Sequence, residues 1–248
     1  MRNGTPPNAV LVTGPPGAGK STALMALDDR HPDLARFGVR DYGLRLAAAG
    51  HPLGTRMRET LLRQELLPDE LVRLEFAHFL DHLPAAVRVV AVEGYPRDLP
   101  QCDDLLRTAA DRDVRVTGFA VVTVPDGTAR TRVANRRLCV ECGATTDAPD
   151  APACPGCGGG VMRRRDDAAA SFERRLADYH RIIGDLRAYF AERSLLREVD
   201  GTRPSDEVRA ALWESLDAMD AMDAMDAVDA VDADVPDSTD DLTDGLED

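Results

Sequence analysis

The feature that most constrains this chain is residues 14–22, which read Gly-Pro-Pro-Gly-Ala-Gly-Lys-Ser-Thr. They satisfy the pattern G-x-x-x-x-G-K-[ST], in which loop glycines let backbone N–H groups approach phosphate oxygens closely. A helix must begin at the lysine, because its positive end then faces the same anion. The apolar run before the loop completes a strand, loop and helix unit. The stretch therefore predicts an α/β fold that binds phosphate.

A pattern of nine residues can also arise by chance, as a turn before an ordinary helix. The composition argues against that alternative, because 29 of the 30 basic side chains are arginine and Lys20 is the only lysine. The single lysine stands at the position where the pattern requires one. We therefore expect Lys20 to reach the β and γ phosphates of a nucleotide, and the Ser21 hydroxyl to be available to Mg²⁺.

The net charge of −14 is concentrated at the C-terminal end, since residues 217–248 hold 13 acidic and no basic side chains. The rest of the chain has 30 basic against 31 acidic residues. Its clustered arginines favour a small anionic substrate over a nucleic-acid partner. The tail repeats Asp-Ala-Met and Asp-Ala-Val with a period of three, which predicts disorder. It is either a tolerated repeat expansion or an acidic arm for a basic partner.

The sequence contains no run of eighteen apolar residues and no apolar N-terminal signal segment. We therefore expect a cytoplasmic protein that has no membrane partner. Only 4% of the residues are aromatic, so aliphatic side chains must supply the core.

Apolar runs alternate with helical stretches, which predicts a parallel sheet with helices on both faces. Strands are expected at residues 9–13, 34–39, 87–93, 116–124 and 195–199. Helices are expected at residues 20–30, 99–111, 126–138, 166–192 and 204–216, with a broken helical insertion, suited to a moving flap, over 44–80. Glu93 ends the third strand, where open α/β sheets place ligands. Arg132 and Arg136 would share a face of the helix 126–138.

Four of the five cysteines form two Cys-x-x-Cys pairs, with eleven residues between the pairs: Cys139, Cys142, Cys154 and Cys157. A glycine follows each pair, as in a zinc ribbon. Residues 139–157 contain few apolar side chains, so bound zinc would hold this loop together. Four protein ligands leave no open position, which indicates a structural metal. A loop without metal or a redox pair is the alternative, and Cys102 is expected to be a spectator.

Four motifs follow one another along the chain: the phosphate loop, Glu93-Gly94-Tyr95-Pro96-Arg97, the four cysteines and Arg164-Arg165-Asp166-Asp167. In this order they resemble the adenylate kinase family of the zinc-lid type, over residues 9–216. The resemblance implies a monomer that transfers phosphoryl reversibly from Mg-ATP to a nucleoside monophosphate, giving two ADP from AMP. It implies a P-loop core (1–39, 71–137 and 166–216), a monophosphate-binding flap (40–70), a zinc lid (138–165) and a disordered acidic tail (217–248).

The resemblance also implies roles for single residues. Those expected to bind ATP are Gly17, Ala18, Gly19, Lys20, Ser21, Thr22, Arg132 on the adenine, Arg136, Thr145, Thr146 and Arg203. Those expected to bind the monophosphate are Arg45, Glu65, Leu66, Leu67, Gly94, Tyr95, Pro96, Arg97, Arg164, Arg175 and, reading adenine, Gln101. The catalytic cations would be Lys20, Arg45, Arg97, Arg136, Arg164 and Arg175. Ser21 and Glu93 would attend Mg²⁺.

Three features depart from the pattern of that family. Val39-Arg40-Asp41-Tyr42 replaces the usual S-T-G-D, Glu93 replaces an aspartate near the Mg²⁺ waters, and the spacer between the cysteine pairs is short. These departures leave open a kinase for CMP, UMP or a deoxynucleotide, and a nucleotide-binding regulator with little turnover. A nucleic-acid binder built on the zinc ribbon is disfavoured, because the ribbon lacks stacking aromatic residues.

Overall fold

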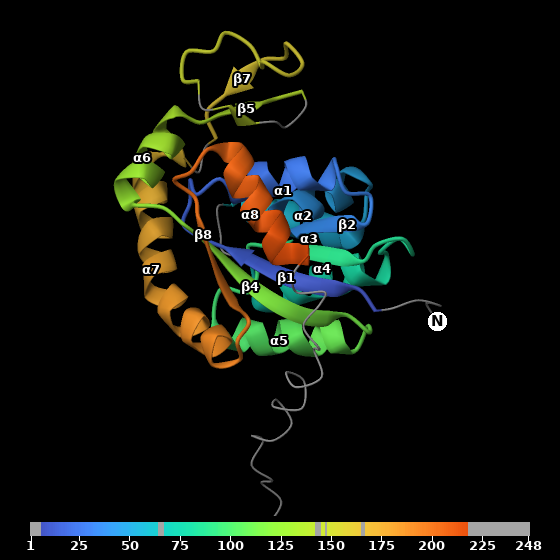
Figure 1. Cartoon of the computed structure of the whole chain (residues 1–248). Helices are drawn as coiled ribbons and strands as arrows, with labels where there is room; N and C mark the ends of the chain where they lie inside the picture. The colour runs from blue at the N-terminus through green and yellow to red at the C-terminus, as the bar shows by residue number, and fades with distance from the viewer. Residues whose placement is uncertain (1–5, 64–66, 142–144, 147, 165–166, 218–248) are drawn as a thin grey trace, which may run out of the picture.

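The computed structural model describes residues 6–63, 67–141, 145–146, 148–164 and 167–217 (Figure 1). Its centre is a five-stranded parallel sheet with the strand order β2-β3-β1-β4-β8. The strands are β1 (Asn8–Thr13), β2 (Leu34–Gly38), β3 (Val89–Glu93), β4 (Arg115–Thr123) and β8 (Leu196–Asp200). The α/β class with a parallel sheet, predicted from the sequence, is confirmed.

Helices cover both faces of this sheet. They are α1 (Lys20–Asp28), α2 (Val39–Ala48), α3 (Pro52–Leu62), α4 (Asp69–Asp81), α5 (Leu99–Ala110), α6 (Asp126–Asn135), α7 (Ala169–Glu192) and α8 (Ser205–Asp217). Successive residues of a strand point to opposite faces, so Val10 and Val12 pack toward α1 and α8, whereas Ala9 and Leu11 pack toward α4, α5 and α7. A strand buried on both faces explains the continuous apolar run.

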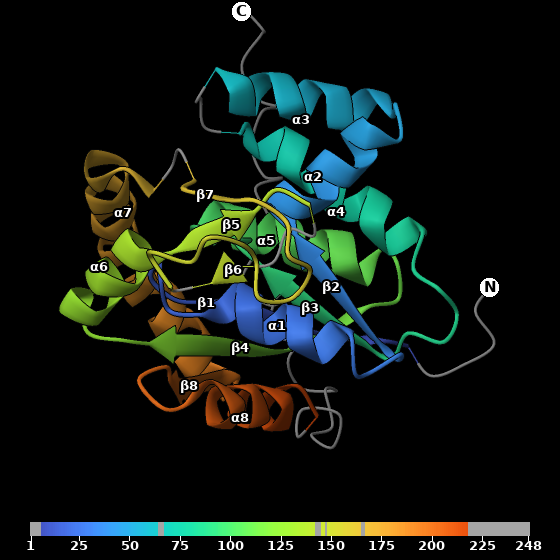
Figure 2. The same cartoon turned by 90° about the horizontal axis from the view of Figure 1, so that it is seen from above.

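The C-terminal helix α8 completes one face of the sheet. Leu212 and Leu216 are fully buried against α1, and the Trp213 ring stacks on His31 in the turn between α1 and β2. The two ring centroids lie 3.5 Å apart, with 18° between the ring planes. Figure 2 shows α8 on the opposite side of the molecule from α3. The predicted tail begins with Asp217, the last residue of α8, and its remainder, 218–248, lies outside the described residues.

A small antiparallel sheet lies apart from the main sheet, above α1 (Figures 1 and 2). It has the strand order β6-β5-β7, formed by β5 (Arg137–Cys139), β6 (Thr145–Thr146) and β7 (Val161–Met162). It occupies the segment that the sequence predicts to be a lid. In the described part of the chain, no helix is both long enough and apolar enough to cross a membrane.

Most predicted element bounds differ from the observed ones by a few residues, and two of these differences affect the site. The helix expected at 126–138 ends at Asn135, because Arg136 has a ψ angle of 134° and leads the chain into β5. Arg132 and Arg136 therefore do not share a helix face. The helical insertion begins at Val39 rather than at Leu44, with Asp41 in the first turn of α2, where a negative charge favours a helix.

Candidate functional site

The phosphate loop fits against its neighbours because its glycines lack a side chain. A Cβ at Gly14 would lie 2.3 Å from the Val122 carbonyl oxygen of β4, and one at Gly17 would lie 2.7 Å from the Ala129 carbonyl oxygen of α6. Gly19 is the N-cap of α1 with a φ of 92°, a conformation that favours glycine. The loop is therefore fixed between β4 and α6, with the N-terminus of α1 open to an anion.

The backbone of the phosphate loop holds the Lys20 side chain in place. Its Nζ donates hydrogen bonds to the carbonyl oxygens of Gly14 (2.7 Å) and Pro15 (3.0 Å). Burial lowers the pKa of Lys20 to about 8, an effect that Glu93 opposes and that Arg136 and Arg175 reinforce. The ammonium group therefore lies within the electrostatic influence of both the strand-end glutamate and the lid-side arginines.

Glu93 lies at the carboxyl end of β3, beside the start of α1. Its Oε1 accepts a hydrogen bond from the Ser21 hydroxyl at 2.5 Å, and its Oε2 accepts from Arg36 of β2. A hydroxyl and a carboxylate are hard oxygen donors of the kind that Mg²⁺ prefers, so the predicted Ser21 and Glu93 pair fits that ion. Arg36 is a member of this group that the sequence prediction missed, although a charged residue inside a buried strand is a signal.

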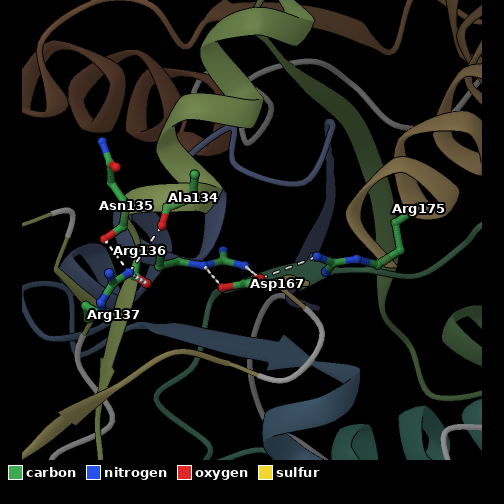
Figure 3. A network of polar contacts seen from close by, with 6 residues as sticks. All are labelled: Ala134, Asn135, Arg136, Arg137, Asp167 and Arg175. Carbon is green, nitrogen blue, oxygen red and sulfur yellow. Dashed lines mark hydrogen bonds and ion pairs between the residues drawn. The ribbon is translucent and has the colours of Figure 1, made fainter. Parts of the chain in front are cut away.

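On the lid side, two of the predicted arginines converge on one carboxylate (Figure 3). Arg136 Nε donates to Asp167 Oδ2 at 2.8 Å, its Nη2 bonds Oδ1, and Arg175 Nη2 lies 3.5 Å from the same Oδ1. The Asp167 side chain is fully buried. Arg164 precedes this group, and its carbonyl oxygen accepts from the Asp167 amide. Asp167 was part of the predicted motif, but its role as the shared anchor was not predicted.

The lid contacts the helix that follows the phosphate loop. The hydroxyl oxygens of Thr145 in β6 and Thr22 in α1 lie 3.2 Å apart, which brings together two predicted ATP-binding residues. Thr146 is the next residue of β6 and is half-buried. At the same end of the sheet, Arg132 donates to the Gly201 carbonyl oxygen at 2.8 Å. Arg203 is exposed and lies 3.8 Å from Asp200 and Glu207.

Three cysteines of the lid lie close together. The Sγ atoms of Cys139, Cys154 and Cys157 lie within 4.8 Å of one another, close enough to share a metal ion. The Gly158 amide donates to the Cys154 carbonyl oxygen, and the Cys154 amide donates to Gly159, which forms a tight turn around the second pair. The fourth predicted ligand, Cys142, lies outside the described residues. Cys102 is buried in the core at a distance from this cluster.

A small cavity lies beyond the end of β3. It is lined by Val39, Leu67, Val72, Gly94, Arg97 and Gln101. Tyr95 and Pro96 are buried beside it, and Arg45 is exposed on α2 with its guanidinium 5.4 Å from the Tyr42 ring. The structure thus brings together four residues of the predicted monophosphate side, Leu67, Gly94, Arg97 and Gln101. Glu65 and Leu66 lie outside the described residues.

The Gln101 carboxamide is fixed in this cavity by its neighbours. Its Oε1 accepts from the Arg97 amide at 2.9 Å, and its Nε2 donates to Asp69 of α4 at 2.8 Å. Asp98 caps α5 by accepting from the Gln101 amide at 2.9 Å. The sequence prediction included Gln101 but not Asp69, which lies 32 residues earlier in the chain.

Comparison with known proteins places this geometry in a family. No protein-family model matches the chain. The adenylate kinase of Desulforudis audaxviator is 31% identical over 214 residues, which cover 84% of this chain and 98% of the relative. The adenylate kinase of Paracoccus denitrificans is 30% identical over 214 residues (84% and 96%), and that of Carboxydothermus hydrogenoformans is 29% identical over 222 residues (84% and 98%). The chain therefore belongs to the adenylate kinase family of nucleoside monophosphate kinases.

Proposed function

We propose that this protein transfers the terminal phosphoryl group of Mg-ATP reversibly to a nucleoside monophosphate, and that AMP is the preferred acceptor. One observation carries the proposal: the phosphate loop and the small cavity follow two neighbouring strands. β1 and β3 pair in parallel, with Val12 opposite Glu93, so both sites lie at the carboxyl edge of the sheet. A phosphate chain in the loop and an acceptor in the cavity would meet between them.

In the proposed reaction, an acceptor phosphate oxygen forms a bond to the γ-phosphorus of ATP. The bond from that phosphorus to the β,γ-bridging oxygen breaks, and its electron pair stays on ADP. Charge spreads over the oxygens of the transferring group, so cations around it stabilise the transition state. Bound Mg²⁺ supplies part of this charge. The protein cations proposed to surround the group are Lys20, Arg45, Arg97, Arg136, Arg164 and Arg175.

On the ATP side, we assign the phosphates to the loop and the adenosine to the lid and the C-terminal end of the sheet. The contact between Thr22 and Thr145 supports this assignment, because it brings the lid onto the helix that begins at the loop. The other residues assigned here are Gly17, Ala18, Gly19, Ser21, Arg132, Thr146 and Arg203. The division into core (1–39, 71–137 and 166–216), flap (40–70) and lid (138–165) is part of the same proposal.

The Gln101 carboxamide supports AMP as the acceptor. Its oxygen has two lone pairs and its nitrogen two protons, and the contacts with Arg97 and Asp69 use one of each. One acceptor and one donor remain, which match the amino group and the N1 atom of adenine. Leu67 and Val72 provide apolar walls for a flat base.

The cysteine cluster is proposed to hold a structural Zn²⁺ completed by Cys142. Thiolates are preferred zinc ligands, and the three described Sγ atoms lie within 4.8 Å of one another. This small sheet has few apolar side chains, so the metal would supply much of its stability. The proposed zinc takes no part in the phosphoryl transfer.

A coupled assay with Mg-ATP and a panel of AMP, CMP, UMP, GMP and their deoxy forms tests the proposal. We expect kcat/KM to be at least about tenfold higher for AMP than for any other ribonucleotide, a difference of about 1.4 kcal/mol. Gln101→Leu should remove most of this preference. A preference for CMP or UMP would contradict only the choice of AMP as the acceptor. No turnover with any acceptor would favour a nucleotide-binding regulator over a kinase.

A further inference from the structure

Arg36 is a charged residue in the middle of a buried strand. β2 reads Leu-Ala-Arg-Phe-Gly, and the Arg36 side chain is only 11% exposed. A guanidinium withdrawn from water is costly unless charged partners and hydrogen bonds compensate it. Such a residue therefore needs partners from other parts of the fold.

Gly38 provides the space that these contacts need. A Cβ at Gly38 would lie 3.1 Å from Nη2 of Arg36 and 3.5 Å from Oδ2 of Asp41. Gly38 is also paired with Glu93 on the neighbouring strand β3. Because alternate strand residues share a face, Arg36 lies on the same face as Gly38 and Glu93. The missing side chain lets the guanidinium extend along the sheet to the glutamate.

Arg36 joins two carboxylates from different elements. Its Nε and Nη2 donate to Glu93 Oε2 at 3.1 Å and 2.7 Å, and Nη2 also donates to Asp41 Oδ2 of α2 at 2.6 Å. Since Ser21 already binds Oε1, both oxygens of Glu93 have a partner. The long Glu93 side chain is therefore held in one position, although fixing a flexible glutamate costs conformational entropy.

We propose that Arg36 is a positioning residue for phosphoryl transfer, which holds Glu93 against Ser21 and, through Asp41, links this carboxylate to the flap helix α2. The inference rests on the proposed kinase function. It relates two departures from the family pattern, because the longer acid at the strand end and the aspartate in the first turn of α2 are partners of one arginine. One guanidinium between two carboxylates leaves a net charge of −1, which still favours a cation beside Ser21.

Loss of Arg36 would leave Glu93 and Asp41 as two nearby carboxylates without their shared countercharge. Their repulsion would move Glu93 away from Ser21, because nothing else described binds its Oε2. The described side-chain partners of Arg36 are Glu93 and Asp41, not Lys20 or a loop glycine, so the phosphate loop itself should stay intact. The loss should therefore change turnover and the response to Mg²⁺ more than the binding of ATP.

The first test compares Arg36→Met with the wild type over a range of Mg²⁺ concentrations. We expect kcat to fall at least about tenfold and the Mg²⁺ concentration for half-maximal rate to rise at least about threefold, with the KM for ATP within about twofold. Arg36→Lys keeps the charge but not the fork of donors, so it should be intermediate. If Arg36→Met does not fold, Arg36→Lys takes its place as the test variant. Arg107→Met, which breaks an exposed ion pair with Asp104, is the matched control and should change neither value.

The second test is a double-mutant cycle of Arg36→Met with Glu93→Gln. If Arg36 acts through Glu93, the double variant should have the kcat of Glu93→Gln within about twofold. If the reductions in kcat of the two single variants multiply in the double variant, the inference is overturned, because Arg36 would then act independently of Glu93. An unchanged Mg²⁺ requirement in Arg36→Met would overturn it as well.

Calorimetry separates this inference from the proposed function. ATP is titrated into each protein with and without Mg²⁺, in the absence of any acceptor. In the wild type, Mg²⁺ should increase ATP affinity, and this gain should shrink at least about threefold in Arg36→Met. A wild type that turns over no monophosphate contradicts the proposed function, whereas an equal gain in both proteins contradicts the role of Arg36.

Discussion

Two clusters of arginine and carboxylate flank the phosphate loop, and they have opposite compositions. On the lid side, Arg136 and Arg175 share Asp167, and these three described side chains sum to a charge of +1. At the edge between β2 and β3, Glu93 and Asp41 share Arg36, which sums to −1. Under the proposed function, the same pair of side-chain types would favour anionic phosphate beside one cluster and a cation beside the other.

Lys20 lies between these clusters and responds to both. Burial is the main cause of its lowered pKa, Glu93 raises it, and the two lid-side arginines lower it further. A bound phosphate chain would extend across the same space. The phosphate loop therefore lies between a positive and a negative group of side chains, and both groups influence the pKa of Lys20.

The largest expected effect comes from Lys20→Arg. An ammonium is a compact charge that fits over the Gly14 and Pro15 carbonyl oxygens, whereas a guanidinium is wider and has a rigid fork of donors. The loop cannot widen, because Gly14 already contacts β4. We expect kcat to fall at least about a hundredfold, or about 2.7 kcal/mol, with an unchanged melting temperature. Near-normal activity would contradict the assigned role of Lys20.

The pH dependence sharpens this prediction. Lys20 has a folded-state pKa of about 8, below its ordinary value of 10.5, so the unliganded enzyme loses this proton as pH rises through about 8. The kcat/KM for ATP should therefore decline above about pH 8 in the wild type, and this decline should be absent in Lys20→Arg. Because the unfolded chain binds this proton more tightly, deprotonation does not destabilise the fold, and the melting temperature should not follow the decline.

The next prediction compares the loss of kcat when one carboxylate is neutralised in each cluster. Asp167→Asn should separate Arg136 from Arg175 and reduce kcat by about thirtyfold, because the transferring group would lose two fixed cations. Asp41→Asn removes a carboxylate that is 51% exposed, and it should reduce kcat by no more than about threefold. Equal losses in the two variants would show that the clusters do not differ in the way proposed.

Removal of the proposed zinc should affect one cluster only. Arg136 directly precedes β5, which ends at Cys139, so a loosened lid would disturb the Arg136 and Asp167 pair first. With a chelator, or in Cys154→Ser, we expect the KM for ATP to rise about tenfold while the KM for the monophosphate changes by less than about twofold. Cys102→Ser is the control. Protein purified without chelator that contains no zinc on elemental analysis would contradict this prediction.

The smallest effect on turnover is expected at a carboxylate that forms no ion pair with an arginine in the described part of the chain. Glu75 of α4 is fully buried beside Gly43 of α2. Burial raises its pKa to about 9, which outweighs the lowering by the Gly43 amide and by Arg45. Since the folded-state pKa lies above the ordinary 4.5, this group's contribution to stability is fully present below about pH 4.5 and is lost as pH rises toward 9. Glu75→Gln should keep its amide neutral throughout and avoid this loss.

Urea unfolding at pH 5 and pH 8 measures the effect. The advantage of Glu75→Gln over the wild type should grow with pH, by at most about 1.4 kcal/mol per pH unit. Glu59→Gln, on the exposed face of α3, is the matched control and should show no such growth. An advantage that is equal at the two pH values would mean that Glu75 keeps the same charge in the folded and unfolded states.

Much of this molecule could be predicted from local sequence. The phosphate loop, the apolar strands that alternate with helices, and the two cysteine pairs can each be recognised from residues that are close in the chain. Glu75 could also have been noticed, because it interrupts an apolar stripe between Leu71 and Phe79 at helical spacing. The apolar stripe nevertheless does not indicate whether the Glu75 carboxyl forms an ion pair or is protonated and neutral.

The contacts of Arg36 could not be predicted in this way. Its partner Glu93 lies 57 residues further along the chain, and the two meet only through the pairing of β2 with β3. The end of α6 at Asn135 has a similar cause, because the chain leaves the helix to form the lid strand β5. Local helical preference for residues 136–138 is overridden by this strand pairing.

The stacking of Trp213 on His31 has a spectroscopic consequence. Trp213 is the only tryptophan in the chain, so the indole fluorescence of the protein originates from one place on α8. That place lies on the opposite side of the molecule from α3 of the flap (Figure 2). Separation of the two rings would change the emission, whereas movement of the flap alone would leave the stacked pair intact. The native indole signal is therefore a label-free reporter of how the C-terminal helix detaches during unfolding.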